Sequence, residues 1–301
     1  MAQASALFAG ATLFTIMVDL GLGLPVDTLT QLRRRPALVG RVLLGSCLLV
    51  PLAALLLLKL PFSQALSPAA RLAIALMVVS PSAPLTLRKA GKQGCDRQLA
   101  ALLQASAAVA AIASIPLMAD ALRSAFGLSG WDIGPLEVAL QVGRVQLLPL
   151  AAGMLLRHGQ PQLAERIEAP LNRLANSLFL VLLLLVLVRT GPLLLPFVSR
   201  ERLALAVMAV LVLATLAIGL LMAGPRAEPQ ERTTVALVTS MRNPGLALLF
   251  AATHAAGQPG VKIAVLAYLL VTVVLSLPFL RWQKRQEAKA EAATRLPLAA
   301  E

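Results

Sequence analysis

The chain has 301 residues, of which 58% are hydrophobic and only 14% are charged, and its mean hydropathy is +0.80. Soluble domains carry about one quarter charged residues, so this composition excludes a soluble globular protein and predicts an integral membrane protein. The net charge is +13. However, the basic residues sit in short segments between apolar stretches, which argues against a nucleic-acid partner.

Nine apolar stretches approach the length of about 20 residues that a membrane-spanning helix needs. The connections between them are short and rich in Pro, Gly and charge. We therefore expect an all-α, polytopic fold with one transmembrane domain, 1–282, in halves 1–125 and 133–282, and a polar tail, 283–301. The predicted spans are 5–24, 37–60, 68–90, 98–122, 135–157, 171–188, 203–223, 233–254 and 261–282.

The positions of the basic residues predict the orientation. The connections after the first, third, fifth and seventh spans, together with the tail, hold 18 of the 27 Lys and Arg residues, and the opposite side holds 7. Basic loops stay in the cytoplasm. We therefore expect the N-terminus outside and the C-terminus in the cytoplasm, in a cell membrane (inner or plasma). This alternation requires nine spans.

The eighth span contains a charged interruption, V-T-S-M-R-N-P-G-L at 238–246. Pro244 lacks an N–H and Gly245 adds backbone freedom, so the helix should break here. A charge at membrane depth costs roughly 2.5–3.5 kcal/mol on insertion scales. Arg242 should therefore face protein or water, and backbone groups freed by the break are tolerated only where they line a cavity. We interpret this stretch as half of a binding site.

The third span contains a similar interruption, S-P-S-A-P-L at 80–85, with Pro81 and Pro84. The third and eighth spans are five apart and so cross the membrane in opposite senses. The next span in each half also ends near a proline, Pro116 and Pro278. Paired, Pro-interrupted spans in oppositely oriented halves are typical of inverted-repeat transporters, although prolines are common in membrane helices.

Polar side chains at the two breaks are candidate substrate ligands because they can both donate and accept hydrogen bonds. Each of them could instead cap a half-helix. They are Thr239, Ser240, Asn243, Ser80, Ser82 and Thr86. Arg242 itself has three interpretations: a built-in replacement for a bound cation, a bidentate ligand for an anionic substrate, or a structural ion pair.

Two further charges lie inside predicted spans. Asp19, in the first span, must be paired or protonated, so it is either a proton carrier or counter-ion, or a buried partner of Arg144 or Arg242. Arg144 lies near the middle of the fifth span, and we interpret it as an ion-pair residue.

Catalytic and cofactor signatures are missing from the sequence. No paired acids or Ser/His/Asp set occurs at helical spacing, and no H-E-x-x-H motif is present. Cys47 and Cys95 fall in different segments and have no metal-binding spacing. We expect a protein that is not an enzyme and holds no metal or cofactor. A channel or a structural membrane subunit is the rival to the transporter interpretation.

Several stretches resemble motifs of the bile acid:sodium symporter family over nearly the whole chain. M-V-D-L-G-L-G-L at 17–24 resembles its M-x-x-G-M-G-L, Pro51 matches a proline of the next helix, and S-P-S-A at 80–83 resembles its C-P-G-G crossover. L-L-P-L-A-A-G at 147–153 resembles L-L-P-x-x-x-G, and M-R-N-P-G-L-A at 241–247 resembles M-Q-N-S-G-L-A. The resemblance implies a nine-helix secondary transporter. In it, two broken helices cross in a core domain beside a panel domain, with alternating access to a cavity between the domains.

The sodium-site residues that the resemblance implies are replaced here. The family's Glu and Gln in E-x-G-M-Q-N fall at Val238 and Arg242. Its S-N pair falls at 86–87, a Gln at Ser46, and a Ser and a Thr at Ala100 and Gln104. A fixed cation would repel sodium at low effective dielectric. We therefore expect transport of a small organic anion without tight sodium coupling. The alternative is sodium- or proton-coupled symport through other ligands such as Asp19.

Overall fold

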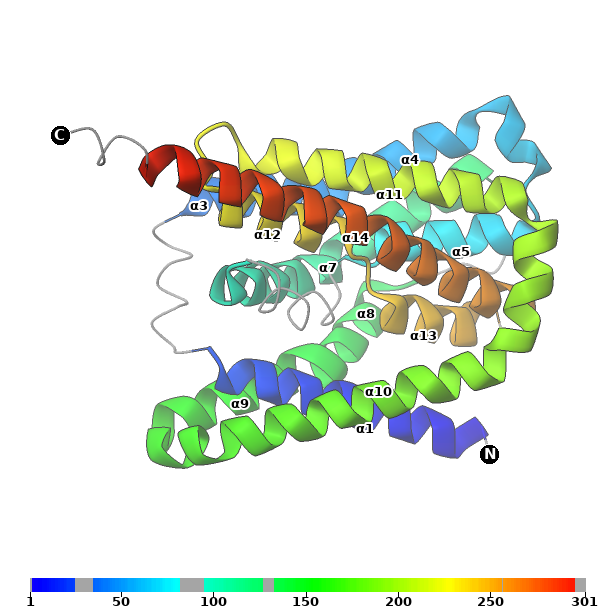
Figure 1. Cartoon of the computed structure of the whole chain (residues 1–301). Coiled ribbons are helices and arrows are strands. Elements are labelled where there is room, and N and C mark those ends of the chain that lie inside the picture. The colour runs from blue at the N-terminus through cyan, green and yellow to red at the C-terminus, as the bar shows by residue number, and fades with distance from the viewer. Residues whose placement is uncertain (1, 25–34, 82–94, 127–132, 256, 296–301) are drawn as a thin grey trace.

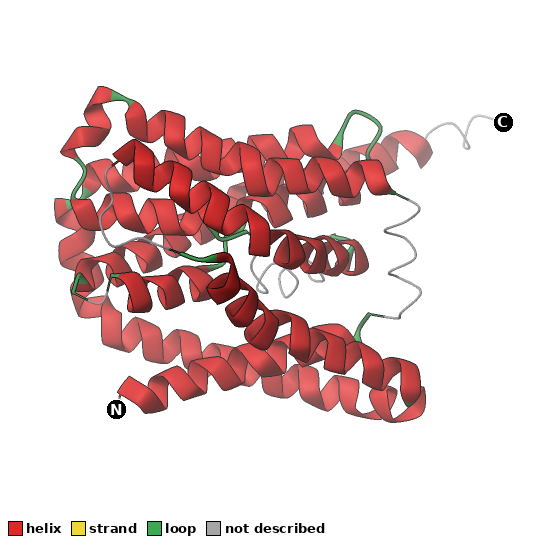
Figure 2. Cartoon of the chain, turned by 180° about the vertical axis from the view of Figure 1, so that it is seen from behind, coloured by secondary structure: helices red, strands yellow, loops and turns green. Residues whose placement is uncertain are grey.

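The computed structural model describes residues 2–24, 35–81, 95–126, 133–255 and 257–295. Within these ranges every regular element is a helix (Figure 2), which confirms the all-α fold class. In chain order the helices are α1 Ala2–Leu22, α3 Pro36–Leu43, η1 Leu44–Leu49, α4 Val50–Lys59, η2 Pro61–Ala65, α5 Pro68–Val79, α7 Arg97–Phe126, α8 Pro135–Val142, η3 Gly143–Leu147, α9 Leu148–Gly159, α10 Pro161–Arg200, α11 Arg202–Ala223, α12 Pro229–Ser240, α13 Pro244–His254 and α14 Pro259–Arg295.

Seven stretches of the described chain are long and apolar enough to cross a membrane, and two shorter apolar helices, Phe8–Leu22 and Pro68–Val79, accompany them. The protein is therefore a polytopic membrane protein, as predicted. The two chain ends lie at opposite ends of the helix stack (Figure 1), as an odd number of crossings requires. The count of nine and the orientation of the termini stay predictions.

The predicted boundaries of two spans differ from the structure, the sixth at both ends and the ninth at its end. The span predicted at 171–188 is the middle of α10, a continuous helix of 40 residues, so the connection expected from 189 to 202 is helical up to Arg200. Likewise α14 continues through Trp282 into the predicted tail and ends at Arg295. The predicted boundaries followed apolar character, whereas backbone hydrogen bonding continues through polar residues once a helix has formed.

Prolines determine where many of these helices begin. A proline at the first helical position loses nothing, because its missing N–H would have no partner inside the helix. Seven α-helices start in this way, at Pro36, Pro68, Pro135, Pro161, Pro229, Pro244 and Pro259. The first half-helices at the two predicted breaks, α5 and α12, both begin with proline and are both 12 residues long. This equality is what two related halves would produce.

The helices form two groups, with α8 running from one toward the other (Figure 1). The smaller group contains α1, α9 and the first part of α10, whose last part turns to pack against α14 and α11 of the larger group (Figure 1). In the smaller group, Gly21 of α1 and Gly153 of α9 lie against each other's helix backbone. A Cβ on Gly21 would overlap the Leu150 carbonyl oxygen, and a Cβ on Gly153 would overlap the Val18 carbonyl oxygen. The glycines of two family-like motifs therefore permit this close packing.

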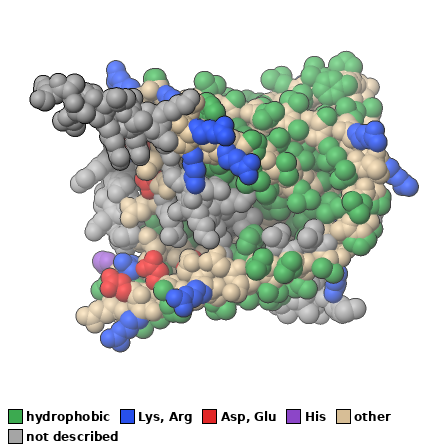
Figure 3. Space-filling model, viewed as in Figure 1, with side chains coloured by type: hydrophobic (Ala, Val, Ile, Leu, Met, Phe, Trp, Pro, Cys, Tyr) green, Lys and Arg blue, Asp and Glu red, His purple; other side chains and the backbone are tan. Residues whose placement is uncertain are grey.

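Burial differs sharply between the spans. In the span from Pro229 to His254, 78% of the apolar window is enclosed by protein, whereas in the span from Pro161 to Val186 only 6% is. Hydrophobic side chains cover much of the outer face of the larger group, with Lys and Arg toward its ends (Figure 3). This arrangement suits a bilayer around the stack and leaves α12 and α13 in its interior.

Candidate functional site: a buried arginine at the crossing of two broken helices

The end of α5 meets the break between α12 and α13. Helix α12 ends at Ser240 and α13 begins at Pro244, with Met241 and Asn243 in extended backbone conformation. Helix α5 ends at Val79, and Ser80 is extended as well. The Asn243 backbone N–H donates to the Ser80 carbonyl oxygen at 3.1 Å. The two interruptions, 163 positions apart in the sequence, are therefore joined by a backbone hydrogen bond.

Arg242 fills the centre of this junction and is 1% exposed. Its Nε donates to the Met77 carbonyl oxygen at 3.3 Å, and its Nη2 donates to the Val78 carbonyl oxygen. Its Nη1 donates to the carbonyl oxygen and the Oγ of Ser46 at 3.1 and 3.0 Å, with a longer contact of 3.5 Å to the Thr239 carbonyl oxygen. The guanidinium thus occupies a cage of oxygens from three helical segments, and all of these acceptors are neutral.

Helix electrostatics explain why a cation is stable there. The last carbonyl groups of a helix carry a partial charge of roughly −0.5. Met77 and Val78 belong to the last turn of α5, and Thr239 belongs to the last turn of α12. Two C-terminal ends therefore contribute a charge of about −1, which one guanidinium balances. Without a cation, these carbonyl groups would face one another in a dry interior, and each unsatisfied group is costly there.

The Ser46 ligands come from a local irregularity. Residues Leu44–Leu49 form a π-helical turn between α3 and α4. Pro51 follows within two residues and cannot donate to the preceding turn, and widening that turn relieves the clash of the proline ring. Such bulges often occur at functional sites. A second π-turn, Gly143–Leu147, precedes Pro149 in the same way and carries Arg144.

The other candidate ligands at the breaks have local roles or no partner. The Asn243 Oδ1 accepts from the Leu246 N–H at 3.1 Å and so caps α13. Ser80 and Ser240 donate to carbonyl groups of their own helices, those of Leu76 and Leu237. In contrast, the Oγ1 of Thr239 and both amide atoms of Gln104 are buried without a hydrogen-bond partner in the described chain. Buried polar atoms of this kind indicate a place where water or a ligand can bind.

The two remaining charged candidates lie away from the junction. Asp19 Oδ2 accepts from Asn172 Nδ2 of α10 at 2.9 Å, and the described hydrogen bonds of the Arg242 guanidinium go to other residues. Arg144 is exposed, and within the described ranges it has no ion-pair partner. Pro81 is buried directly after the end of α5. Ser82, Pro84 and Thr86 lie outside the described residues.

Sequence reasoning missed two features of this region. Most ligands of Arg242 are backbone carbonyl oxygens, which every residue has, so the residue types in the sequence do not reveal them. The other feature is a contact between His254 Nε2, at the end of α13, and Glu137 Oε1, in the first turn of α8, at 3.0 Å. Both residues lie near the ends of predicted spans, and nothing in their spacing links them. No group of metal-binding side chains occurs among the described residues.

The family comparison agrees with this architecture. The model described as Sodium Bile acid symporter family matches residues 11–197, well over half of the chain. The chain belongs to this family. No curated protein matched the chain. The matched residues include the first break. The second crossover, where the sequence departs most from the family motif, lies beyond them. Membership makes this protein a symporter-type membrane transporter for a small molecule.

Proposed function

We propose that this family member moves a small organic anion by alternating access, and that Arg242 replaces the coupling cation. The observation that carries the proposal is the oxygen cage around the guanidinium. In the family motif that 241–247 resembles, a glutamine stands where this chain has Arg242, and the resemblance implies that this glutamine belongs to a sodium site. Here a permanent positive charge is held by the same kind of ligands that sodium prefers, namely neutral oxygens at two helix ends.

The cage also argues against direct binding of the substrate by the Arg242 guanidinium. Its Nε, Nη1 and Nη2 all donate to protein oxygens, and the side chain is fully enclosed. An anion would have to displace several of these carbonyl groups to reach the guanidinium. Arg242 therefore acts as an internal counter-charge that keeps the crossing intact without sodium.

The N-terminal end of α13 is a better candidate for attracting the anion. The charge of Arg242 is balanced by the C-terminal ends of α5 and α12, so the positive end of the α13 dipole remains uncompensated. Gly245 lies in this first turn, is only half-buried, and faces Leu13 of α1. Helix N-termini are natural anion sites. The proposed site therefore lies where the larger group, taken as the core domain, meets the smaller group, taken as the panel domain.

The first test is thermal unfolding of the purified protein with a panel of organic anions, in sodium chloride and in choline chloride at equal ionic strength. We expect the same midpoint in both salts and the same stabilisation by an active anion. In Arg242→Gln, which restores the family residue, we expect a lower midpoint that sodium partly recovers. Arg189→Gln, on the exposed face of α10, is the matched control and should respond like the parent protein.

The alternative is sodium- or proton-coupled symport, with Asp19 as the carrier. It rests on the partly buried position of Asp19 beside Asn172. A saturable stabilisation of the parent protein by sodium would overturn the proposal for Arg242. Anion uptake into proteoliposomes that follows a proton gradient and is lost in Asp19→Asn would favour the alternative.

A further inference from the structure

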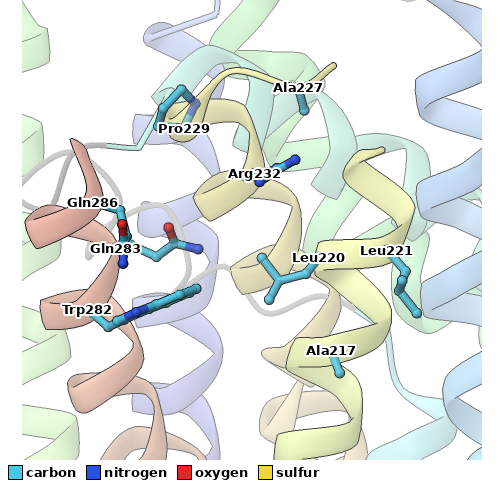
Figure 4. A pocket seen from close by; sticks show the side chains of 9 residues that line it. All are labelled: Ala217, Leu220, Leu221, Ala227, Pro229, Arg232, Trp282, Gln283 and Gln286. Carbon is cyan, nitrogen blue, oxygen red and sulfur yellow. The ribbon is translucent and has the colours of Figure 1, made fainter. Parts of the chain in front are cut away.

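A separate cavity of about 650 Å³ lies between the ends of three helices, away from the crossing (Figure 4). It is formed where α11 ends, α12 begins and α14 leaves the stack, near the C-terminal end of the molecule (Figure 1). Its lining residues are Ala217, Leu220, Leu221, Ala227, Pro229, Arg232, Trp282, Gln283 and Gln286.

One wall of this cavity is apolar and faces outward. Leu221 is 72% exposed although it belongs to the span Arg202–Ala223, so this wall borders the acyl chains of the bilayer. Leu220 continues the wall one residue earlier on α11. Trp282 of α14 is half-exposed on the opposite side, and tryptophan is enriched where a bilayer meets water. The cavity therefore opens at the level where a phospholipid changes from acyl chain to headgroup.

The other wall carries polar groups aimed into the space. Gln283 is 5% exposed and extends from α14 toward α11 and α12 (Figure 4). Its amide lines the cavity and has no hydrogen bond in the part of the chain that the structure describes. An amide that is open to a cavity can both donate to and accept from a ligand there. Arg232 of α12 also reaches the cavity, and the one hydrogen bond described for its side chain goes to the Pro225 carbonyl oxygen at 3.2 Å.

The charges near the cavity are mainly positive. The segments that line it also carry Arg226, Arg281, Lys284 and Arg285. The same segments carry three acids, Glu228, Glu231 and Glu287. Glu231 is paired with Arg35 at 2.6 Å, and Glu228 precedes α12 without capping it. Basic pockets between helix ends are suited to anionic lipid headgroups.

We propose that this cavity binds an anionic phospholipid of the leaflet on the C-terminal side. Its phosphate would lie between Arg232 and the amide of Gln283, and its first acyl methylenes would lie along Leu220 and Leu221. A free phosphate would satisfy the polar wall but leave the apolar wall open to water. Helix α12 runs from this cavity to the oxygen cage around Arg242, so a lipid bound in the cavity would hold the N-terminal end of α12 in place. The proposal does not depend on the transported substrate or on the coupling ion.

The test uses delipidated full-length protein in a neutral detergent. Phosphatidylglycerol, phosphatidylcholine and soluble glycerol phosphate are titrated separately, and native mass spectrometry counts the bound lipids while thermal unfolding reports stabilisation. Two variants weaken the site by different routes: Arg232→Gln removes the cation, and Ala217→Trp fills the space. Arg202→Gln is the matched control, since it removes an exposed arginine from the other end of the same α11 helix.

We expect one tightly retained phosphatidylglycerol and weaker retention of phosphatidylcholine. Arg232→Gln should weaken phosphatidylglycerol binding by about fivefold, the effect of one cation near an anionic surface, and Ala217→Trp should abolish it. Arg202→Gln should leave it unchanged. Equal retention of both lipids, an equal loss in the control, or full protection by glycerol phosphate alone would each overturn the proposal. The last of these would assign the cavity to a soluble anion.

Discussion

The span Pro229–His254 and helix α10 both contain prolines at membrane depth, yet only the first is broken. Helix α10 stays helical past Pro170, Pro192 and Pro196, whereas the other span leaves the helix before Pro244. Their surroundings differ, since the broken span is 78% buried, whereas the part of α10 from Pro161 to Val186, which contains Pro170, is only 6% buried.

The backbone groups that the break frees have partners in the buried span. At the break, the Asn243 N–H reaches Ser80 and the carbonyl oxygen of Thr239 reaches Arg242. Beside lipid the groups freed by a full break would have no partner. A continuous helix loses only the hydrogen bond that each proline cannot donate, and α10 stays continuous. A proline therefore creates a break only where tertiary structure can satisfy the groups that it frees.

The strongest test of this difference between the two spans is to remove the buried charge of Arg242. We expect Arg242→Met to lower the free energy of unfolding by about 3–5 kcal/mol, the range for breaking a buried charged interaction, because several carbonyl groups lose their donor. Arg189→Met on α10 removes an exposed arginine and should change stability by less than about 0.5 kcal/mol. Thermal unfolding in detergent compares the two. Similar losses in both variants would contradict the cage as the source of stability.

This pair of arginines also shows what the sequence could predict. The position of Arg242 beside Pro244 in an apolar run was enough to predict a break and a buried charge. The ligands were not predictable, because Met77, Val78 and Thr239 contribute only their backbone carbonyl groups. In the same way, the length of α10 was underestimated, since polar residues at a helix end do not stop hydrogen bonding.

A second test concerns the packing of the smaller group, where helices approach closely rather than break. Gly153→Ala places a methyl group on the backbone of α1 near Val18, and rigid backbone cannot move aside as a side chain can. We expect a loss of about 1–3 kcal/mol, as for overpacked cores. Gly10→Ala on α1 has open space and should be neutral or slightly stabilising. Equal thermal midpoints for both variants would contradict the close α1–α9 contact.

A third test separates the capping role of Asn243 from the hydrogen bond that its backbone makes. Asn243→Ala removes the acceptor for the Leu246 N–H but keeps the backbone donor to Ser80. We expect a loss of about 1 kcal/mol, typical of a missing N-cap. Asn243→Ser should recover most of this loss. If the alanine variant instead loses as much stability as Arg242→Met, the side chain has a role beyond capping.

The smallest effect is expected at the contact between His254 and Glu137, which joins the end of α13 to the start of α8 at 3.0 Å. Their side chains are 15% and 31% exposed, so water screens the pair, and its coupling energy should be about 0.2–1 kcal/mol. A double-mutant cycle of Glu137→Ala and His254→Ala, measured by thermal unfolding, isolates that energy. A coupling of zero would mean that the contact does not hold this end together. A coupling energy in the stated range, together with faster anion exchange in the variants, would show that this contact restrains α13 against α8.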